Sequence, residues 1–214
     1  MEDNYPWLQC YPEGIPHSIN PDQYNSLGDL IHESAEKYKT QVAFENIGKK
    51  LSYSDIDALT DDFASFLQNE IKLQKGDRIA LQMPNLLQYP IAMFGALKAG
   101  VIVVNTNPLY TQPEMEHQFN DSGVKAIVIL ANFAHNLEGV LKNTSIEHVI
   151  ITEIGDLIGG LKGHLVNFVV KRIKKMVPSY NISGALSFKM CLAKGASHQF
   201  KPVEIKSDDL AFLQ

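Results

Sequence analysis

Hydrophobic and polar positions change period along the middle of the chain. Arg78 to Gln82 is a short apolar run typical of a strand, and Leu87 to Lys98 carries apolar residues at helical spacing. Val101 to Val104 consists of β-branched residues only, which favours a strand that is buried on both faces. A strand, a helix and a second strand in this order predict a crossover unit of a parallel sheet.

The residues before this block predict two helices with a hairpin between them. Ser26 is placed to cap the first helix. Its predicted buried face consists of Leu27, Leu30, Ile31 and Ala35. Val42 to Asn46 and Lys50 to Tyr53 flank turn residues and predict a hairpin, and Ser54 is the predicted cap of a helix that runs to about Glu70.

The residues after the block continue the alternation of helices and strands. We expect a helix at about Gln112 to Asp121, a strand at Lys125 to Leu130, a helix at about Phe133 to Lys142 and a strand at His148 to Thr152. Strands separated by helices in this way predict an α/β fold with a mainly parallel sheet flanked by helices.

The segment from Leu157 to Val177 combines an apolar stripe with a basic face. The stripe consists of Ile158, Leu161, Leu165, Val169, Ile173 and Met176. The basic residues are Lys171, Arg172, Lys174 and Lys175. One interpretation is a helix that packs its stripe on the protein core and leaves the lysines in water. The other is a helix that lies in the surface of an anionic membrane, which makes these four residues candidate membrane-surface residues.

The charge distribution supports a negatively charged partner for this part of the chain. The 214 residues hold 24 acidic and 19 basic side chains, a net charge of −5. From Leu157 to Val203, however, the sequence contains eight Lys or Arg and no Asp or Glu. Such a cationic segment usually faces lipid headgroups, phosphates or an acidic patch. We expect no nucleic-acid partner.

Composition favours a globular protein of the cytoplasm. The chain is 45% hydrophobic and has only two cysteines, Cys10 and Cys191, which form no disulfide framework. The N-terminal residues lack the basic and apolar regions of a signal peptide, and no apolar run is long enough for a membrane-spanning helix. Membrane contact is therefore expected only at the surface, on the inner face of the cell membrane.

Common catalytic motifs are absent from the sequence. It contains no GxxxxGK[ST], GxGxxG, GxSxG or HExxH pattern, and its seven histidines lack ligand spacing. Glu114, Glu116 and Asp121 could be taken for an acid–base group, but a solvated helix face is the commoner cause of such a pattern.

The ordered blocks of the sequence resemble one family. The block from Gly76 to Thr111 reads GDRIALQMPNLLQYPIAMFGALKAGVIVVNTNPLYT, and Glu114 to Ile129 reads EMEHQFNDSGVKAIVI. Both are similar to the N-terminal part of adenylate-forming acyl-CoA synthetases, and most closely to bacterial long-chain fatty-acid CoA ligases. The resemblance extends to three further segments, YPEGIPHSINPDQYNSLGDL, HLVNFVVKRIKKMVPSYN and SDDLAFLQ.

The resemblance implies a longer enzyme, which we call the parent enzyme. Members of the family use ATP and Mg²⁺ to convert a fatty acid to an acyl-adenylate, and then transfer the acyl group to coenzyme A. A loop of the type YTGGTTGxxKG holds the triphosphate, and it follows the strand that corresponds to Leu210 to Gln214. No residue of this chain matches a catalytic, cofactor-binding or metal-binding motif of the family.

We therefore expect residues 1–25 to form an extended N-terminal arm. Residues 26–214 should form an incomplete N-terminal adenylate-forming domain that ends just before the phosphate-binding loop and is inactive alone. Fatty acid and CoA would be partners through the parent enzyme, and a homodimer is a further candidate. The alternatives are a non-catalytic lipid-surface or partner-binding module of the same fold, and a dinucleotide-binding domain, although the latter lacks its Gly-rich fingerprint.

Overall fold

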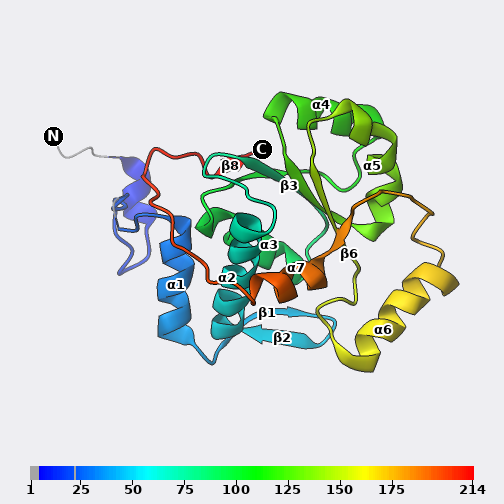
Figure 1. The fold of residues 1–214 in the computed structure, drawn as a ribbon. Coiled ribbons are helices and arrows are strands. Elements are labelled where there is room, and N and C mark those ends of the chain that lie inside the picture. Colours follow the sequence, from blue (N-terminus) through cyan, green and yellow to red (C-terminus); the bar gives the residue numbers. More distant parts are fainter. Residues whose placement is uncertain (1–4, 22) are drawn as a thin grey trace.

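A six-stranded sheet forms the centre of the computed structural model, which describes residues 5–21 and 23–214 (Figure 1). The strands are β3 (Arg78–Gln82), β4 (Ile102–Asn105), β5 (Ala126–Leu130), β6 (His148–Thr152), β7 (Leu186–Ser187) and β8 (Phe212–Leu213). They lie in the order β7-β6-β5-β3-β4-β8, and all neighbouring pairs are parallel. The predicted parallel sheet is confirmed, with Ile79 of β3 paired to Val103 of β4.

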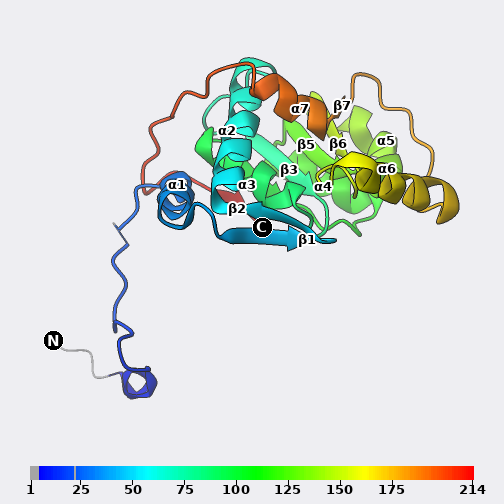
Figure 2. The same cartoon turned by 90° about the horizontal axis from the view of Figure 1, so that it is seen from below.

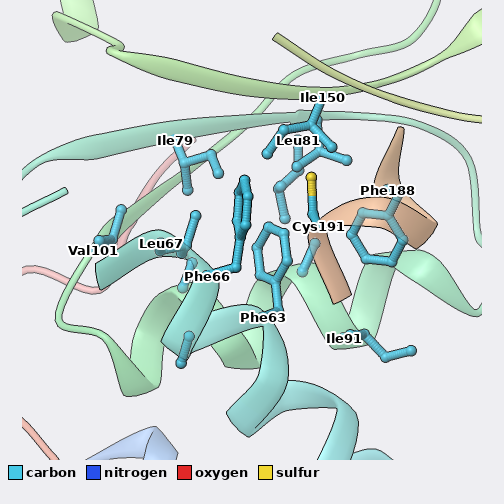
Figure 3. Close-up of a cluster of buried hydrophobic side chains, with 14 of the residues drawn as sticks. Phe63, Phe66, Leu67, Ile79, Leu81, Ile91, Val101, Ile150, Phe188 and Cys191 are labelled. Carbon is cyan, nitrogen blue, oxygen red and sulfur yellow. The ribbon is translucent and has the colours of Figure 1, made fainter. Parts of the chain in front are cut away.

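Helices α2 (Tyr53–Asn69), α3 (Gln88–Lys98) and α7 (Phe188–Gly195) cover one face of the sheet. Their apolar side chains and those of the strands form one buried cluster (Figure 3). Labelled members are Phe63, Phe66, Leu67, Ile79, Leu81, Ile91, Val101, Ile150, Phe188 and Cys191. The rings of Phe63 and Phe188 lie 5.3 Å apart, an aromatic contact that joins α7 to α2 and contributes about 1 kcal/mol.

Helices α4 (Gln112–Ser122) and α5 (Ala134–Val140) cover the opposite face. Short 3₁₀ turns, η2 (Ala131–Phe133) and η3 (Leu141–Asn143), flank α5. A second buried cluster fills this layer, and it includes Met115, Phe119, Ile127, Ile129, Leu137 and Val140. The fold is therefore the predicted three-layer arrangement of helix, sheet and helix.

Helix α1 (Leu27–Tyr38) and the hairpin of β1 (Val42–Asn46) and β2 (Lys49–Ser52) lie outside these layers (Figure 2). The hairpin is confirmed, with β2 shifted by one residue from its predicted start. Ser26 caps α1 as predicted, because its hydroxyl accepts a hydrogen bond from the Asp29 amide. Leu27, the first residue of α1, was expected on its buried face but is 38% exposed.

The cap of α2 differs from the predicted one. Ser52, not Ser54, precedes the helix, and its hydroxyl accepts a hydrogen bond from the Asp55 amide at 3.2 Å. The Asp55 carboxylate in turn accepts from the Ser52 amide at 2.8 Å, which completes a capping box. Ser54 instead donates its hydroxyl to the Lys39 carbonyl oxygen. The helix therefore begins two residues earlier than the sequence pattern suggests.

The N-terminal arm runs away from the body of the protein (Figure 2). Its described part contains one short 3₁₀ helix, η1 (Pro6–Cys10), whereas the sequence predicts an extended arm throughout. Residues 1–4 and 22 of the predicted arm lie outside the described residues.

A buried lysine joins the three helices α1, α2 and α3. Lys98, on α3, has a side chain that is only 6% exposed, and its ammonium lies 2.6 Å from a carboxylate oxygen of both Asp57 and Asp61 on α2. The other carboxylate oxygen of Asp57 lies 3.0 Å from Nδ1 of His32 on α1. Two carboxylates thus compensate one buried ammonium, and the pairing fixes how these helices pack.

We expect Lys98→Met to lower the free energy of unfolding by roughly 3 kcal/mol, because it leaves Asp57 and Asp61 next to each other without a cation. Urea denaturation measures this difference. The matched control is Lys50→Met, since Lys50 forms only an exposed pair with Glu45 at 3.7 Å. Its effect should stay below about 1 kcal/mol. Equal losses in the two variants would contradict a structural role for the Lys98 cluster.

Candidate functional site: the basic segment between β6 and β7

The basic segment forms a helical unit at the edge of the molecule (Figures 1 and 2). It consists of α6 (Gly160–Phe168) and the π-helical turn η4 (Val169–Ile173). The predicted helix from Leu157 to Val177 is therefore shorter at both ends. Gly159, just before α6, has a φ of +75°, and Gly160, its first residue, has a φ of +54°. Lys175, two residues after η4, has a φ of +52°, so the backbone leaves the right-handed helical region on both sides of the unit.

The apolar stripe of this unit faces outward. Leu161 is 89% exposed, Ile173 is 63% exposed and Phe168, which extends the apolar surface, is 56% exposed. Leu165 and Met176 are also exposed. Four of the six stripe residues therefore do not pack on the core of this chain, whereas Ile158 and Val169 are half-buried. Several large apolar side chains on one exposed helix are typical of a surface that contacts a partner or a membrane.

A close backbone contact holds α6 on the body of the protein. Gly163 of α6 lies against Gly155, so that a Cβ atom on Gly163 would be 2.5 Å from the Gly155 carbonyl oxygen. The Gly155 amide donates a hydrogen bond of 2.7 Å to the side-chain oxygen of Asn167, one turn further along the helix. The helix α6 is therefore anchored by its backbone, by the Asn167 side chain and by Lys162, whose ammonium donates a hydrogen bond of 2.7 Å to the Ile47 carbonyl oxygen.

A polar network connects this anchor to the end of β6. The Asp156 carboxylate accepts hydrogen bonds from the Glu153 amide at 2.8 Å and the Thr152 hydroxyl at 3.1 Å. The buried amide of Gln88, at the start of α3, donates to the Thr152 hydroxyl at 3.0 Å and to the Glu153 carbonyl oxygen at 2.9 Å. The side chains of Gln88, Thr152 and Asp156 therefore fix the start of α6 relative to the sheet. No sequence motif predicted this role for them.

The structure brings the four candidate membrane-surface residues, Lys171, Arg172, Lys174 and Lys175, together at the end of the unit, and all four are exposed. The Lys171 ammonium lies 3.8 Å from a Glu153 carboxylate oxygen. Within residues 5–21 and 23–214, the other three cations have no carboxylate within 4.0 Å. Their positive charge is therefore available to an external anion.

Exposed cations and exposed apolar side chains are the chemical groups that this segment presents. In the described part of the chain, no group of three or more His, Cys, Asp or Glu side chains could hold a metal ion. Likewise, none of the described helices combines the length and the apolar character needed to cross a bilayer.

Glu114, one of the acidic residues noted in the sequence, serves as a helix cap of α4. Hydrogen bonds from the Thr111 hydroxyl and amide lower the pKa of its carboxyl group. Glu114 therefore has a structural role in the fold.

Comparison with known proteins identifies the family. The model of the AMP-binding enzyme family matches residues 31–214, which is most of the chain. This chain belongs to the AMP-binding enzyme family. It is 51% identical over 208 residues to a long-chain-fatty-acid–CoA ligase of Salmonella typhimurium, and 47% identical to one of Haemophilus influenzae. Each match covers 97% of this chain and 37% of the relative, so the chain spans little more than a third of the length of these ligases.

Solved structures of CoA ligases share the fold. A long-chain-fatty-acid–CoA ligase from Archaeoglobus fulgidus matches with a TM-score of 0.69 at 22% identity, over 94% of this chain and 36% of that one. An anthranilate–CoA ligase in complex with anthranoyl-AMP matches with a TM-score of 0.72 at 14% identity, over 92% of this chain and 33% of that one. The resemblance found in the sequence and the predicted fold class are thus confirmed.

We expect Gly163→Ala to detach α6 from the body of the protein, because the new methyl group would collide with the Gly155 carbonyl group. Amide hydrogen exchange should then become faster in residues 161–168, while the amides of β5 keep their protection. Leu161→Ala is the matched control, since this side chain on the same helix is 89% exposed. If both variants exchange at the same rate in α6, the glycine contact is not the anchor.

Proposed function

We propose that this chain is the N-terminal part of a long-chain-fatty-acid–CoA ligase. The parent enzyme would join a fatty acid to coenzyme A through an acyl-adenylate, with release of AMP and pyrophosphate. The observation that carries this proposal is the identity of 51% over 97% of the chain to a ligase of this name. Membership of the AMP-binding enzyme family supports the use of ATP.

The chain would contribute scaffold to the parent enzyme. In the residues that the structure describes, no segment matches the Gly/Ser/Thr-rich loop of the family, and no group of three or more His, Cys, Asp or Glu side chains could hold a metal ion. We assign ATP, Mg²⁺ and CoA to the parent enzyme and none of them to this chain alone. We further propose that the parent enzyme lies in the cytoplasm.

We also propose that the basic segment attaches the enzyme to the inner face of the membrane. Exposed Leu161, Leu165 and Phe168 could enter the interfacial region of a bilayer. Each cation near anionic lipid would add about 1 kcal/mol, and four cations lie at the end of the same helical unit. The exposed apolar side chains and the cations thus both favour attachment to the membrane through the α6–η4 unit.

A homodimer is a further proposal, and the N-terminal arm supports it. Trp7 and Ile19 on this arm are 55% and 87% exposed, and the arm runs away from the body of its own chain (Figure 2). Large apolar side chains in such an arm favour contact with a second molecule.

Membrane attachment predicts a loss of vesicle binding when the charge of the basic segment is reversed. The variant is Lys171→Glu with Lys174→Glu and Lys175→Glu, and the measurement is co-sedimentation with vesicles that contain phosphatidylglycerol, at low salt. The control carries Lys142→Glu, Lys189→Glu and Lys201→Glu, which change the net charge equally at other exposed sites. The first variant should bind at least tenfold more weakly than the control. Equal binding by the two variants would rule out this membrane surface.

The ligase proposal predicts different activities for the chain and its parent enzyme. The assay is ATP–pyrophosphate exchange with palmitate and Mg²⁺. The parent enzyme should exchange, whereas the 214-residue chain should not exceed a protein-free blank, because loss of even one transition-state donor costs roughly 10²- to 10³-fold in rate. Exchange by the chain alone would show that it holds an adenylation site. A parent protein inactive with all acyl chains would favour the alternative, a non-catalytic lipid-surface or partner-binding module.

A further inference from the structure

An open pocket lies beside η4, and we call it the η4 pocket. Its lining residues are Lys171, Arg172, Val177, Pro178, Ser179 and Tyr180, and its volume is about 370 Å³. The pocket contains two of the four cations of the basic segment, whereas Lys174 and Lys175 are not among its lining residues. The cations of this segment therefore differ in their surroundings although they are neighbours in sequence.

The backbone after η4 shapes this pocket. The Lys174 amide donates to the Val169 carbonyl oxygen at 2.8 Å, a wide π-helical turn of the kind often found at functional sites. The Met176 amide then reaches back to the Val170 carbonyl oxygen at 3.0 Å, and the Met176 carbonyl oxygen accepts a hydrogen bond from Asn132. These bonds turn the chain so that residues 177–180 line the pocket together with Lys171 and Arg172.

The donors around the pocket suit a phosphate group. Arg172 offers a planar guanidinium, Lys171 an ammonium and Ser179 a hydroxyl, which together match the oxygens of a phosphate. Burial, followed by the nearby Glu153 charge, raises the pKa of Tyr180 above its ordinary value. The phenol therefore stays neutral at physiological pH and can donate a further hydrogen bond.

Among the described residues, Glu153 supplies the one carboxylate within 4.0 Å of the cations in the pocket, and it pairs with Lys171 without a hydrogen bond. The distance of 3.8 Å between the Lys171 ammonium and the Glu153 carboxylate exceeds that of a hydrogen bond. Arg172 has no carboxylate within 4.0 Å among the residues that the structure describes. A structural explanation also exists, since cations near a helix C-terminus interact favourably with the helix dipole. That explanation applies equally to Lys174 and Lys175, which lie at the same helix end.

We propose that the η4 pocket binds a phosphomonoester group through Lys171, Arg172 and Ser179. The group could belong to a lipid headgroup or to a soluble phosphate. For the lipid source, this inference rests on the membrane attachment proposed above. Lys174 and Lys175 would then add only unspecific attraction to a negative surface.

The first test uses inorganic phosphate and glycerol 3-phosphate in solution, so that it does not depend on membrane binding. Titration followed by NMR compares the 214-residue chain with two double variants of equal charge. Lys171→Ala with Arg172→Ala should weaken binding at least tenfold, because charge-assisted hydrogen bonds are lost. Lys174→Ala with Lys175→Ala should change it by less than about threefold. Absence of phosphate binding, or equal weakening in both variants, would overturn the proposal.

The second test separates the two sources of the phosphate. Vesicles with phosphatidic acid are compared with phosphatidylglycerol vesicles adjusted to the same surface potential. A preference for phosphatidic acid that disappears in the Lys171→Ala, Arg172→Ala variant would identify a lipid headgroup as the ligand. Phosphate binding in solution without any vesicle preference would identify a soluble phosphomonoester. In that case the pocket proposal would stand even if the chain failed to bind anionic vesicles, which would refute membrane attachment only.

Discussion

The parallel sheet has no face open to water, and this constraint determines where the surrounding helices lie. All five residues of β5, from Ala126 to Leu130, are at most 2% exposed. A strand in this position has apolar side chains on both sides, so each side needs a covering layer. Helices α2, α3 and α7 supply one layer and α4 and α5 the other. The α6–η4 unit belongs to neither layer, which leaves its surface available for binding.

Parallel strands also bring their carboxyl ends to one edge, and polar groups connect the loops at that edge. The buried Gln82 side chain at the end of β3 donates to the Asn107 carbonyl oxygen at 3.2 Å. The Tyr89 hydroxyl, on α3, donates to the Asn105 side chain at the end of β4 at 2.8 Å. With the Gln88–Thr152 hydrogen bond, these contacts fix the loops after three strands relative to one another. The sheet and these loop contacts thus determine where the basic segment lies.

The sequence pattern predicted the sheet well and the small elements poorly. Runs of β-branched residues favour strands, and the predicted strand from His148 to Thr152 matches β6 residue for residue. Strand β7, with two residues, and α7, with eight, are too short to show a period, although α7 buries Phe188 and Cys191. Burial raises the pKa of the Cys191 thiol to about 12, so this thiol is an unreactive core group.

The orientation of α6 could not be predicted from periodicity, because an apolar stripe looks the same whether it faces a core or the outside. What decides its orientation is the contact between Gly155 and Gly163, two residues that contribute nothing to a hydrophobic pattern. A helix anchored by its backbone, by Asn167 and by Lys162 needs no apolar side chains to hold it to its own chain. Leu161, Leu165 and Phe168 are therefore not required for the docking of α6, and their burial would lower the free energy only against a second surface.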